Sequence, residues 1–431
     1  GIYLIYCEHS ILNIFLFKKI SSALYDHLNS EHPADSNLSY FFKNNANLGL
    51  KERSEVAETY YGIIRNKLLY ENLMQSLQPE HFVIAHLIIE KNFSDEEIKT
   101  LCPDFTFSTQ TLKERLKKIS DLSIRYSLPE WIFRKLAETY DDKNIKLVLN
   151  KLNSPSYLDV RVNTIKEKSR DVIIKNFQDN LSINPKKVTA SIHSPIGIRL
   201  PRGSQIQNLP IFKDGLIEVQ DEGSQILSFI VDANRKHMVA DFCAGAGGKT
   251  LALGAMMSGS GRLYAFDVND KRLMNLRKRL KRSGLSNTVC HHINNENDIR
   301  IKRLRGKFDR VLVDAPCSGL GTIRRNPDLK WKHDLESIFE MQKKQLNILT
   351  AASKLTKLGG RLIYATCSFI PEENEDVINS FLKDNPDFKV MSIQPILDKY
   401  NISVSSEDFF KTKFDEHDMD GFFAAVLEKV N

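Results

Sequence analysis

Two cysteines in the C-terminal half of the chain stand where covalent chemistry can be expected. Arg310 to Val313 and Gly360 to Tyr364 read as strands, and each is followed within a few residues by a cysteine. Because the carboxyl ends of parallel strands meet at one edge of a sheet, Cys317 and Cys367 should face one crevice beside Asp314. A single cysteine at a strand end is most often a small buried residue, but two beside an acid favour catalysis.

Such a group of side chains fits methyl transfer to carbon 5 of cytosine. This carbon is too weak a nucleophile to accept a methyl group unaided. A thiolate that adds to carbon 6 makes the ring enamine-like, so that carbon 5 can attack a methylsulfonium; a base then removes the carbon 5 proton and the thiolate leaves. A carboxyl group at ring N3 or at the exocyclic amine stabilises the charge that develops. Spacing alone does not rank the two cysteines.

A glycine-rich turn provides the candidate cofactor site. The stretch Val239 to Thr250, VADFCAGAGGKT, predicts a strand, a tight turn and a helix whose first N–H groups are unpaired. The first glycine of a phosphate-binding loop is missing at the required spacing before Gly248-Lys249-Thr250, and the dinucleotide fingerprint also fails. Asp267 ends the next predicted strand, where a carboxylate can accept both ribose hydroxyls. The pattern is typical of class I methyltransferases that bind S-adenosylmethionine, although a plain tight connection is the alternative.

The composition is that of a globular protein. Of 431 residues, 27% are charged and 42% hydrophobic, and the formal net charge of +7 permits a nucleic-acid partner without requiring one. The length predicts roughly two to four domains. The cysteines stand at positions 7, 102, 243, 290, 317 and 367. They show no Cys-x-x-Cys pairing, so we expect no metal, no disulfide framework and a reduced, cytoplasmic setting. We further expect a monomer.

The N-terminal stretch Gly1 to Ile20 is apolar but interrupted by charged residues such as Lys18 and Lys19. It is too short and too charged to span a bilayer, and it lacks a basic leader and a small-residue cleavage site. We therefore interpret it as a core helix and expect no membrane partner. The first residue is glycine rather than methionine, which indicates processing, an added residue or a truncated reading frame.

Three regions follow from the periodicity of the apolar residues. Residues 1–145 predict a helical bundle of about six helices, with prolines between them. Residues 150–235 predict a small α/β domain and a linker helix, and residues 236–431 predict a Rossmann-like α/β class I methyltransferase domain. Strands are expected at 157–163, 188–190, 197–200 and 217–220, then at 238–242, 262–268, 288–293, 310–313 and 360–364, with a late edge strand at 421–427.

Basic residues gather between positions 271 and 307. Part of this belt must be the solvated face of a helix, yet so many like charges repel one another unless an anion is near. The belt is therefore equally consistent with RNA contact and with a solvated helix face. The belt consists of Lys271, Arg272, Arg277, Lys278, Arg279, Lys281, Arg282, Arg300, Lys302, Arg303, Arg305 and Lys307.

Five stretches together resemble one known family. They are VQDEGSQ (219–225), DFCAGAGGKT (241–250), DAPCSGLGTIRRNPDLKW (314–331), YATCSFIPEENEDVI (364–378) and DGFFAA (420–425). In this order they are similar to the RsmB/Sun-type (Nop/Sun) family of RNA 5-methylcytosine methyltransferases, over about residues 155–428. The N-terminal bundle is similar in length and helical character to the NusB-like domain of the bacterial ribosomal members.

The resemblance implies a role for each matching residue. Cys367 stands where the family keeps its covalent nucleophile, and Cys317 where it keeps the cysteine that helps to release the methylated RNA. Asp314 matches the carboxylate beside cofactor and base, and Lys249 can orient it. The implied cofactor is S-adenosyl-L-methionine, with expected contacts from Cys243, Ala244, Gly245, Ala246, Gly247, Gly248, Lys249, Asp267, Asn294 and Asp314.

Two positions depart from the family pattern. The family usually has Ala-Pro-Gly-Gly in the cofactor loop, whereas Gly245 and Ala246 stand here and predict a more flexible turn. The family also places an acidic residue near the adenine, after the third strand of the domain. In the run Ile293 to Glu296 we align Asn294 with it, and Asn295 is the alternative, since an amide oxygen can accept from the adenine amino group. Both departures predict weakened cofactor binding.

The preferred function is methylation of carbon 5 of a cytosine in RNA, with ribosomal RNA as the substrate. A transfer RNA substrate stays open. So does a catalytically weak RNA-binding or assembly factor with the same fold, although such a protein need not retain both thiols. A class I methyltransferase for a small molecule or a protein would need neither a covalent thiol nor the basic belt.

Overall fold

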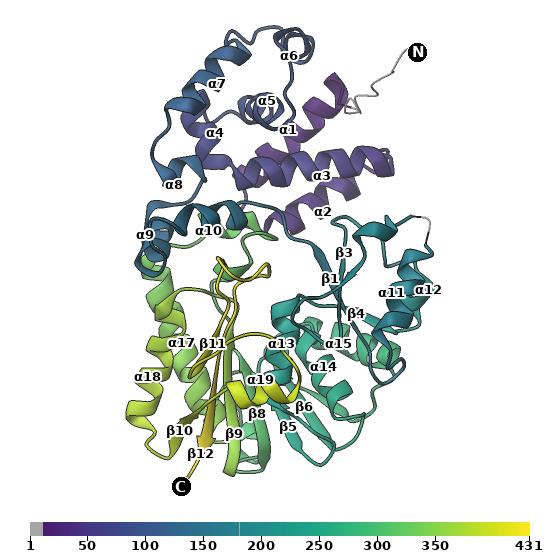
Figure 1. The fold of residues 1–431 in the computed structure, drawn as a ribbon, viewed down its shortest axis with the longest axis vertical. Helices are drawn as coiled ribbons and strands as arrows, with labels where there is room; N and C mark the ends of the chain where they lie inside the picture. Colours follow the sequence, from purple (N-terminus) through teal and green to yellow (C-terminus); the bar gives the residue numbers. More distant parts are fainter. Residues whose placement is uncertain (1–11, 181) are drawn as a thin grey trace. The chain divides into compact units, whose positions relative to one another are not determined.

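The computed structural model describes residues 12–180 and 182–431, which divide into two compact units (Figure 1). The helical unit comprises the described residues up to Ser154 together with Ile323–Lys332, and the α/β unit comprises Pro155–Thr322 and His333–Asn431. The core helix expected at Gly1 to Ile20 lies partly outside the described residues, and α1 begins at Ile14. Among the described residues, no helix combines the length and the apolarity that crossing a bilayer would need.

Between residues 12 and 154 the chain forms ten α-helices, where about six were predicted. The prediction relied on prolines, and it missed breaks without one: α3 and α4 separate at Asn66, and α5 and α6 separate between Lys91 and Ser94. The helices are α1 (Ile14–Leu28), α2 (Ala34–Asn44), α3 (Leu50–Arg65), α4 (Lys67–Met74), α5 (Pro79–Glu90), α6 (Asp95–Leu101), α7 (Thr109–Lys118), α8 (Leu122–Arg125), α9 (Glu130–Thr139) and α10 (Ile145–Leu152).

A segment from the C-terminal half of the sequence completes the helical unit. Within Ile323–Lys332, which includes the 3-10 helix η3 (Pro327–Trp331), the Lys330 side chain is buried. Its Nζ donates to Arg65 O at 2.9 Å, to Ser127 O at 3.0 Å and to Asn153 Oδ1 at 3.0 Å. Burial lowers the pKa of Lys330, and the three acceptors satisfy its three N–H donors. The end of the motif DAPCSGLGTIRRNPDLKW therefore belongs structurally to the helical bundle.

The α/β unit begins with a small antiparallel sheet in the order β2-β3-β1-β4, whose strands lie where they were predicted to within two residues. The strands are β1 (Leu158–Val162), β2 (Thr189–Ala190), β3 (Gly197–Leu200) and β4 (Ile217–Val219). Around them lie α11 (Arg170–Gln178), η1 (Pro185–Lys187) and α12 (Pro210–Lys213), and α13 (Glu222–Val231) leads onward.

The second sheet has eight strands, seven of them in the order β10-β12-β9-β8-β5-β6-β7. The pairs β5 with β6, β6 with β7, β5 with β8 and β8 with β9 are parallel. The strands are β5 (Met238–Asp241), β6 (Arg262–Asp267), β7 (Thr288–His292), β8 (Phe308–Asp314), β9 (Thr356–Thr366), β10 (Phe388–Met391), β11 (Phe409–Lys411) and β12 (Phe423–Lys429). The helices are α14 (Gly248–Met256), α15 (Asp270–Ser283), α16 (Ile299–Lys302), α17 (Leu335–Ser353), α18 (Glu375–Asp384) and α19 (Gln394–Lys399), with 3-10 turns η2 (Leu320–Thr322) and η4 (Pro371–Glu373).

The prediction of an edge strand near the C-terminus was wrong. β12 lies between β9 and β10, with both neighbours antiparallel to it. The short strand β10, which was not predicted, takes the edge instead. Alternate side chains from Phe423 to Leu427 pack into the cores on the two faces of the sheet, which explains why this stretch is buried without polar alternation.

Alternate residues of the central strands pack into two different layers. Val239, Leu312 and Ile363 lie in one core with side chains of α13, α14 and α19. Their neighbours in sequence, such as Ala240 and Val311, lie in the other core with side chains of α17 and α18. Both faces of the sheet are therefore covered, and its ligand sites must lie at the strand ends.

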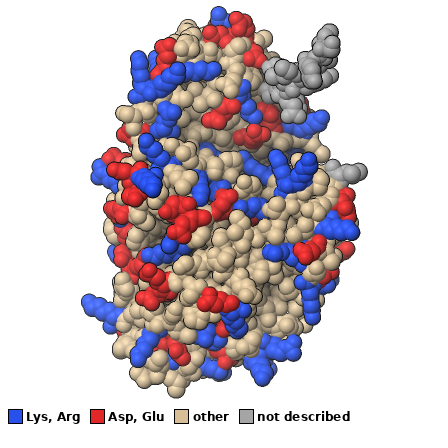
Figure 2. All heavy atoms as spheres, in the orientation of Figure 1, with Lys and Arg blue, Asp and Glu red and all other residues tan. Residues whose placement is uncertain are grey.

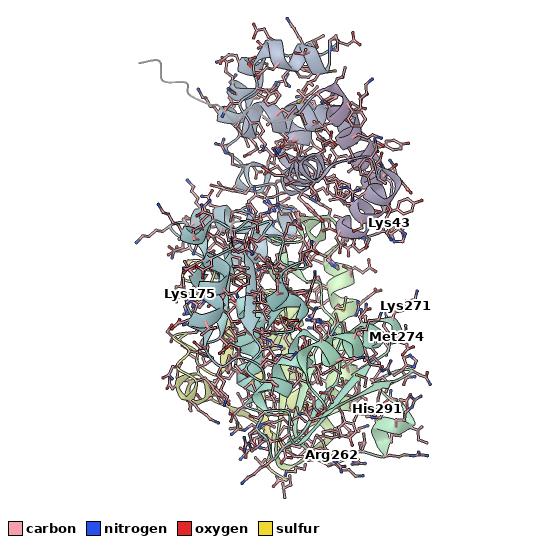
Figure 3. All side chains as sticks on the ribbon, turned by 90° about the vertical axis from the view of Figure 1, so that its right-hand side faces the viewer. Lys43, Lys175, Arg262, Lys271, Met274 and His291 are labelled. Atoms are coloured by element: carbon pink, nitrogen blue, oxygen red, sulfur yellow. The ribbon has the colours of Figure 1, made fainter. Side chains whose placement is uncertain are left out.

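The basic belt proves to be partly a structural feature. Arg279 and Arg282 on α15 each place an Nη2 within 2.9 Å of the Glu218 carboxylate on β4, so the two arginines join α15 to the small sheet. Burial alone would raise the pKa of Glu218, but the two arginines outweigh burial and hold it below its ordinary value. Other members of the belt stay exposed, among them Lys271, which lies with Met274 and His291 at one side of the molecule (Figure 3). The face drawn in Figure 2 shows acidic and basic side chains interspersed.

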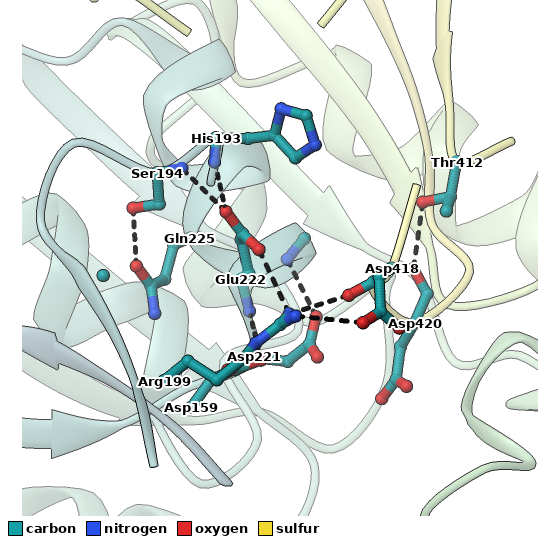
Figure 4. Close-up of polar contacts among 12 residues, drawn as sticks. Asp159, His193, Ser194, Arg199, Asp221, Glu222, Gln225, Thr412, Asp418 and Asp420 are labelled. Carbon is teal, nitrogen blue, oxygen red and sulfur yellow. Dashed lines mark hydrogen bonds and ion pairs between the residues drawn. The ribbon is translucent and has the colours of Figure 1, made fainter. Parts of the chain in front are cut away.

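A second buried ion cluster joins the small sheet to the loop before β12 (Figure 4). The guanidinium of Arg199 on β3 lies 3.2 Å from Asp159 on β1, 3.3 Å from Glu222 at the start of α13, and 3.3 Å from Asp418. Arg199 Nη2 also donates to the carbonyl oxygen of Asp418 at 2.7 Å. The loop before β12 is thereby fixed to the small sheet.

Replacing Glu218 by glutamine should test the first of these clusters. The variant leaves two partly buried arginines without their counter-charge, so its free energy of unfolding at pH 7 should fall by on the order of 3 kcal/mol. Because the folded-state pKa of Glu218 is depressed, the charge stabilises the protein fully above the unfolded value of about 4.3, and its contribution is lost as the pH falls through the folded-state pKa. Urea unfolding of both proteins from pH 7 downward measures the difference.

The matched control is Asp270→Asn, because Asp270 makes a 3.7 Å pair with Arg277 in which both side chains are about half exposed. Such a pair contributes less than about 1 kcal/mol. A Glu218→Gln variant as stable as this control would show that the belt is not anchored through Glu218.

Candidate active site

The glycine-rich turn after β5 is held in a fixed conformation. Gly245 and Gly247 adopt φ values of 56° and 89°, in the left-handed region that glycine tolerates best. A Cβ at Gly247 would also lie 2.2 Å from Leu276 Cδ1. The N–H of Gly245 donates to Asp267 Oδ2 at 2.8 Å, which ties the turn to the end of β6.

Beneath this turn, the carboxyl group of Asp241 is buried at the end of β5. Burial raises the pKa of Asp241 to about 7, and the Thr250 hydroxyl donates to its Oδ2 at 2.7 Å. The hydroxyl comes from the first turn of α14, so this bond attaches the helix start to the strand end.

A cavity of about 550 Å³ opens between the turn and the ends of β6, β7 and β8. A volume of this size is within the usual range of about 300 to 1,000 Å³ for small-molecule sites. Every residue of the predicted loop contributes to its wall, and so do the predicted Asp267 and Asp314. The lining consists of Ser224, Phe242, Cys243, Ala244, Gly245, Ala246, Gly247, Gly248, Lys249, Asp267, Val268, Arg272, Ile293, Glu296, Asp314, Pro316, Lys344 and Ile348.

Asn294, the residue aligned with the expected adenine contact, is not part of this lining, and neither is Asn295. Both are exposed, and the N–H of Asn294 donates to Asp298 Oδ2 at 3.0 Å. The turn after β7 instead brings Ile293 and Glu296 to the cavity. Sequence reasoning passed over Glu296, although its acidic side chain was the available signal, because it counted directly from the strand end. It also missed the polar lining residues Ser224, Arg272 and Lys344.

Lys249 is a wall residue rather than a surface lysine, with a side chain only 11% exposed. Its Nζ lies 2.7 Å from Asp314 Oδ2. Burial alone would lower the pKa of Lys249, but the carboxylate of Asp314 and, to a lesser degree, the thiol of Cys367 outweigh burial and raise it. Lys249 is therefore positively charged and holds the Asp314 side chain in the wall of the cavity.

The two predicted cysteines meet at the carboxyl ends of β8 and β9. These strands pair in parallel with Asp314 opposite Ala365, so the loops that follow them start side by side. Cys317 Sγ lies 3.2 Å from Cys367 Sγ. This hydrogen bond and burial raise the pKa of Cys317 well above its ordinary value. Cys317 therefore keeps its proton, and either thiol can donate in the bond between the two sulfurs.

The remaining described cysteines lie away from this pair. Cys243 lines the cavity, and burial raises the pKa of its thiol, so it is neutral there. Cys102 belongs to the helical unit and Cys290 to β7. Cys7 lies outside the described residues.

The arrangement brings together a cavity, an ion pair and two thiols. A cavity suited to a nucleoside-like ligand ends at the ion pair of Lys249 and Asp314, and Pro316, the residue before Cys317, belongs to its wall. Neither Cys317 nor Cys367 belongs to the wall, but a reacting group beside Pro316 would lie near two thiols whose sulfurs are 3.2 Å apart. Nucleophilic addition by sulfur is the chemistry that such a site can perform.

Known proteins share both sequence and fold with this chain. Residues 228–428 match the family described as 16S rRNA methyltransferase RsmB/F. The ribosomal RNA small subunit methyltransferase B of Shewanella oneidensis is 30% identical over 410 residues, which are 88% of this chain and 91% of that protein. The "Probable ribosomal RNA small subunit methyltransferase B" of Synechocystis is 31% identical over 329 residues, which are 74% of this chain and 72% of that protein.

A solved structure supports the same conclusion. The crystal structure of PH0851 is 25% identical, has a TM-score of 0.78, and covers 97% of this chain and 99% of that chain. The predicted fold class, a helical N-terminal part followed by a Rossmann-like methyltransferase domain, is thereby confirmed. Membership of a methyltransferase family also confirms S-adenosylmethionine as the cofactor. The chain belongs to the RsmB/F family of RNA methyltransferases.

Proposed function

We propose that the protein methylates carbon 5 of a cytosine in RNA through a covalent bond between Cys367 and carbon 6. The 3.2 Å separation of the Cys317 and Cys367 sulfurs, beside a cofactor-sized cavity, carries this proposal. Methylation of RNA at oxygen or nitrogen needs no thiol, and a non-catalytic assembly factor needs neither cysteine.

The names of the relatives favour ribosomal RNA as the substrate, with transfer RNA as the alternative. Two relatives that match over most of their length are named for methylation of small-subunit ribosomal RNA. A ribosomal substrate would also place the reaction in the cytoplasm, as the cysteine usage predicts.

The lining of the cavity is suited to S-adenosylmethionine, which supplies the methyl group as a sulfonium when bound. We assign the turn Cys243–Lys249 to the methionine portion and Asp267 to the ribose hydroxyls. Each Asp267 oxygen accepts one backbone N–H, from Gly245 or Asn269, and keeps a further lone pair for a hydroxyl. We assign Glu296, in place of Asn294, to the adenine amino group.

The residues of the chain then divide the chemistry among them. Once the Cys367 thiol has lost its proton to a base, its Sγ forms a bond to carbon 6 as the double bond between carbons 5 and 6 opens. The negative charge that this places on the ring is stabilised by a proton passed to N3 from the Lys249–Asp314 ion pair, and the proton returns there when the double bond forms again. After carbon 5 has gained the methyl group and lost its proton to a base, the bond from carbon 6 to sulfur breaks and its electron pair returns to Cys367. The Cys317 S–H, whose sulfur lies 3.2 Å from that of Cys367, donates to the departing thiolate and stabilises it.

Bisulfite sequencing of RNA from cells with and without the gene tests the proposal directly. A methylated cytosine that disappears without the gene and returns with it would identify both the reaction and the RNA. If no cytosine in any RNA changes, the proposal is wrong.

Replacing Cys367 by alanine should abolish methyl transfer and leave cofactor binding nearly unchanged, because the thiol acts on the base. Tritium transfer from labelled S-adenosylmethionine measures the first effect, and calorimetry measures the second. Cys290→Ala is the matched control, because Cys290 lies on β7 away from the pair and its loss should leave both measurements unaltered. Turnover by the Cys367 variant would exclude it as the nucleophile.

Replacing Asp267 by alanine should weaken binding of S-adenosylmethionine by on the order of 1 to 3 kcal/mol, because charged hydrogen-bond acceptors are lost. Calorimetry measures the change. Asp270→Ala, an exposed acid three residues away, serves as the control. Equal affinities for the two variants would remove Asp267 from the ribose site.

Replacing Cys317 by alanine should allow the adduct and methyl transfer but prevent release. The protein should then accumulate as a covalent complex with RNA, seen as a slow band on a denaturing gel, and the band should need an intact Cys367. Normal turnover of the variant, or a band that survives in the Cys317/Cys367 double variant, would contradict the two-cysteine chemistry.

A further inference from the structure

A carboxyl group that the proposed chemistry does not use is hydrogen-bonded to the residues that follow the two cysteines. Glu373, at the end of η4, is fully buried. Its Oε1 accepts from the Ser318 N–H at 2.7 Å and from Gln345 Nε2 at 3.1 Å. Its Oε2 accepts from the Ser318 hydroxyl at 2.6 Å and from the Ser368 hydroxyl.

Both oxygens of the Glu373 carboxyl group are fully supplied with hydrogen bonds. The backbone N–H of Ser318 and the amide of Gln345 can only donate to it, and the two serine hydroxyls can donate as well. These four hydrogen bonds compensate the loss of water around the buried group. No positively charged side chain is needed to explain the burial of Glu373.

The positions of these partners in the sequence link the Glu373 carboxyl group to the two cysteines. Ser318 directly follows Cys317, and Ser368 directly follows Cys367. One side chain thus holds the residue after each thiol, although the two cysteines stand 50 positions apart.

The support for Glu373 is itself firmly bound. The Tyr364 hydroxyl donates to the carbonyl oxygen of Glu373 at 2.6 Å. The next residue, Asn374, donates from Nδ2 to Ser368 O at 3.0 Å and accepts from the Thr366 hydroxyl at 2.5 Å. The carboxylate therefore cannot move without disturbing the end of β9 and the loop that carries Cys367.

We propose that Glu373 is a positioning residue that sets the distance between the sulfurs of Cys317 and Cys367, and that this distance couples formation of the covalent adduct to its release. The proposal rests on the two-cysteine chemistry proposed above. The charge of Glu373 also contributes, after the hydrogen bond to Cys367 and burial, to the raised pKa of Cys317. Glu373 thus helps to keep the proton on the thiol that lies beside the proposed nucleophile.

Glu373→Gln is the informative variant because it keeps the shape of the side chain. The amide keeps one oxygen for the Ser318 N–H and Gln345, but its NH2 group takes the place of the oxygen that accepts from the Ser318 and Ser368 hydroxyls. Both hydroxyl links are then lost as they stand, so the two loops should separate. Glu375→Gln is the matched control, because Glu375 pairs with Lys411 at the start of α18. If Glu373→Gln does not fold, as judged by thermal unfolding, the Ser318→Ala/Ser368→Ala double variant takes its place. It retains the carboxylate and removes only the two hydroxyl links.

The first measurement reports the sulfur separation without needing RNA. Diamide, an azo oxidant, takes two electrons and two protons from a pair of neighbouring thiols, so that an S–S bond forms and the oxidant becomes a hydrazine. Mass spectrometry follows the Cys317–Cys367 link in the full-length protein. We expect the wild type and Glu375→Gln to form it at equal rates, and Glu373→Gln to form it slower by on the order of tenfold or more.

The second measurement follows methyl transfer to small-subunit ribosomal RNA transcribed in vitro. In Glu373→Gln, kcat should fall by about 100-fold, the loss expected for a misplacement of about 1 Å, while the affinity for S-adenosylmethionine stays that of the wild type. A general loss of packing would lower both and would overturn the proposal.

The two measurements separate the two proposals. If the wild type does not methylate RNA through Cys367 but Glu373→Gln still slows the thiol link, the proposed function fails and the positioning role stands. If the wild type methylates RNA while Glu373→Gln links its thiols and turns over like the control, the positioning role alone is wrong.

Discussion

The parallel pairing of β8 with β9 is the constraint on which the candidate site depends. It places Asp314 opposite Ala365, so that loops from two distant parts of the sequence leave the sheet side by side. The loop after β8 then packs against backbone, since a Cβ at Gly321 would lie 2.0 Å from the carbonyl oxygen of Gly421. Gly321 N–H donates to Cys367 O at 2.9 Å, and Gly421 N–H donates to Gly321 O at 2.7 Å. Three loops are thus interlocked through main-chain groups, which leaves the thiols little freedom.

Buried charges join elements that the backbone hydrogen bonds do not. Glu218 connects the small sheet to α15, and Arg199 connects it to the loop before β12. Lys249 and Asp314 connect the start of α14 to the end of β8. In each case the paired ions come from separate supersecondary elements. The pairing compensates the desolvation of the buried charges, and it also specifies how these elements pack against one another.

The features that could be predicted from the sequence are those that depend on the end of a strand and on the few residues after it. The glycine turn, Asp267 and the two cysteines belong to this class. Glu296 was missed because the course of the turn after β7 is set by hydrogen bonds such as that from Asn294 to Asp298, which strand periodicity does not contain. The role of Glu373 depends on partners 5 and 55 positions away, which only the tertiary fold brings together.

The segment Ile323–Lys332 has a consequence for how such a protein can be divided or recombined. In the sequence this segment lies between the loop of Cys317 and α17. Its buried Lys330 nevertheless donates hydrogen bonds to Arg65, Ser127 and Asn153 of the helical unit. A fragment starting after Ser154 would keep the ammonium group of Lys330 and lose all three acceptors. The helical unit and the methyltransferase domain are therefore not interchangeable modules. Exchanging the helical unit for another domain would also require changes in the segment Ile323–Lys332, which lies within the methyltransferase sequence.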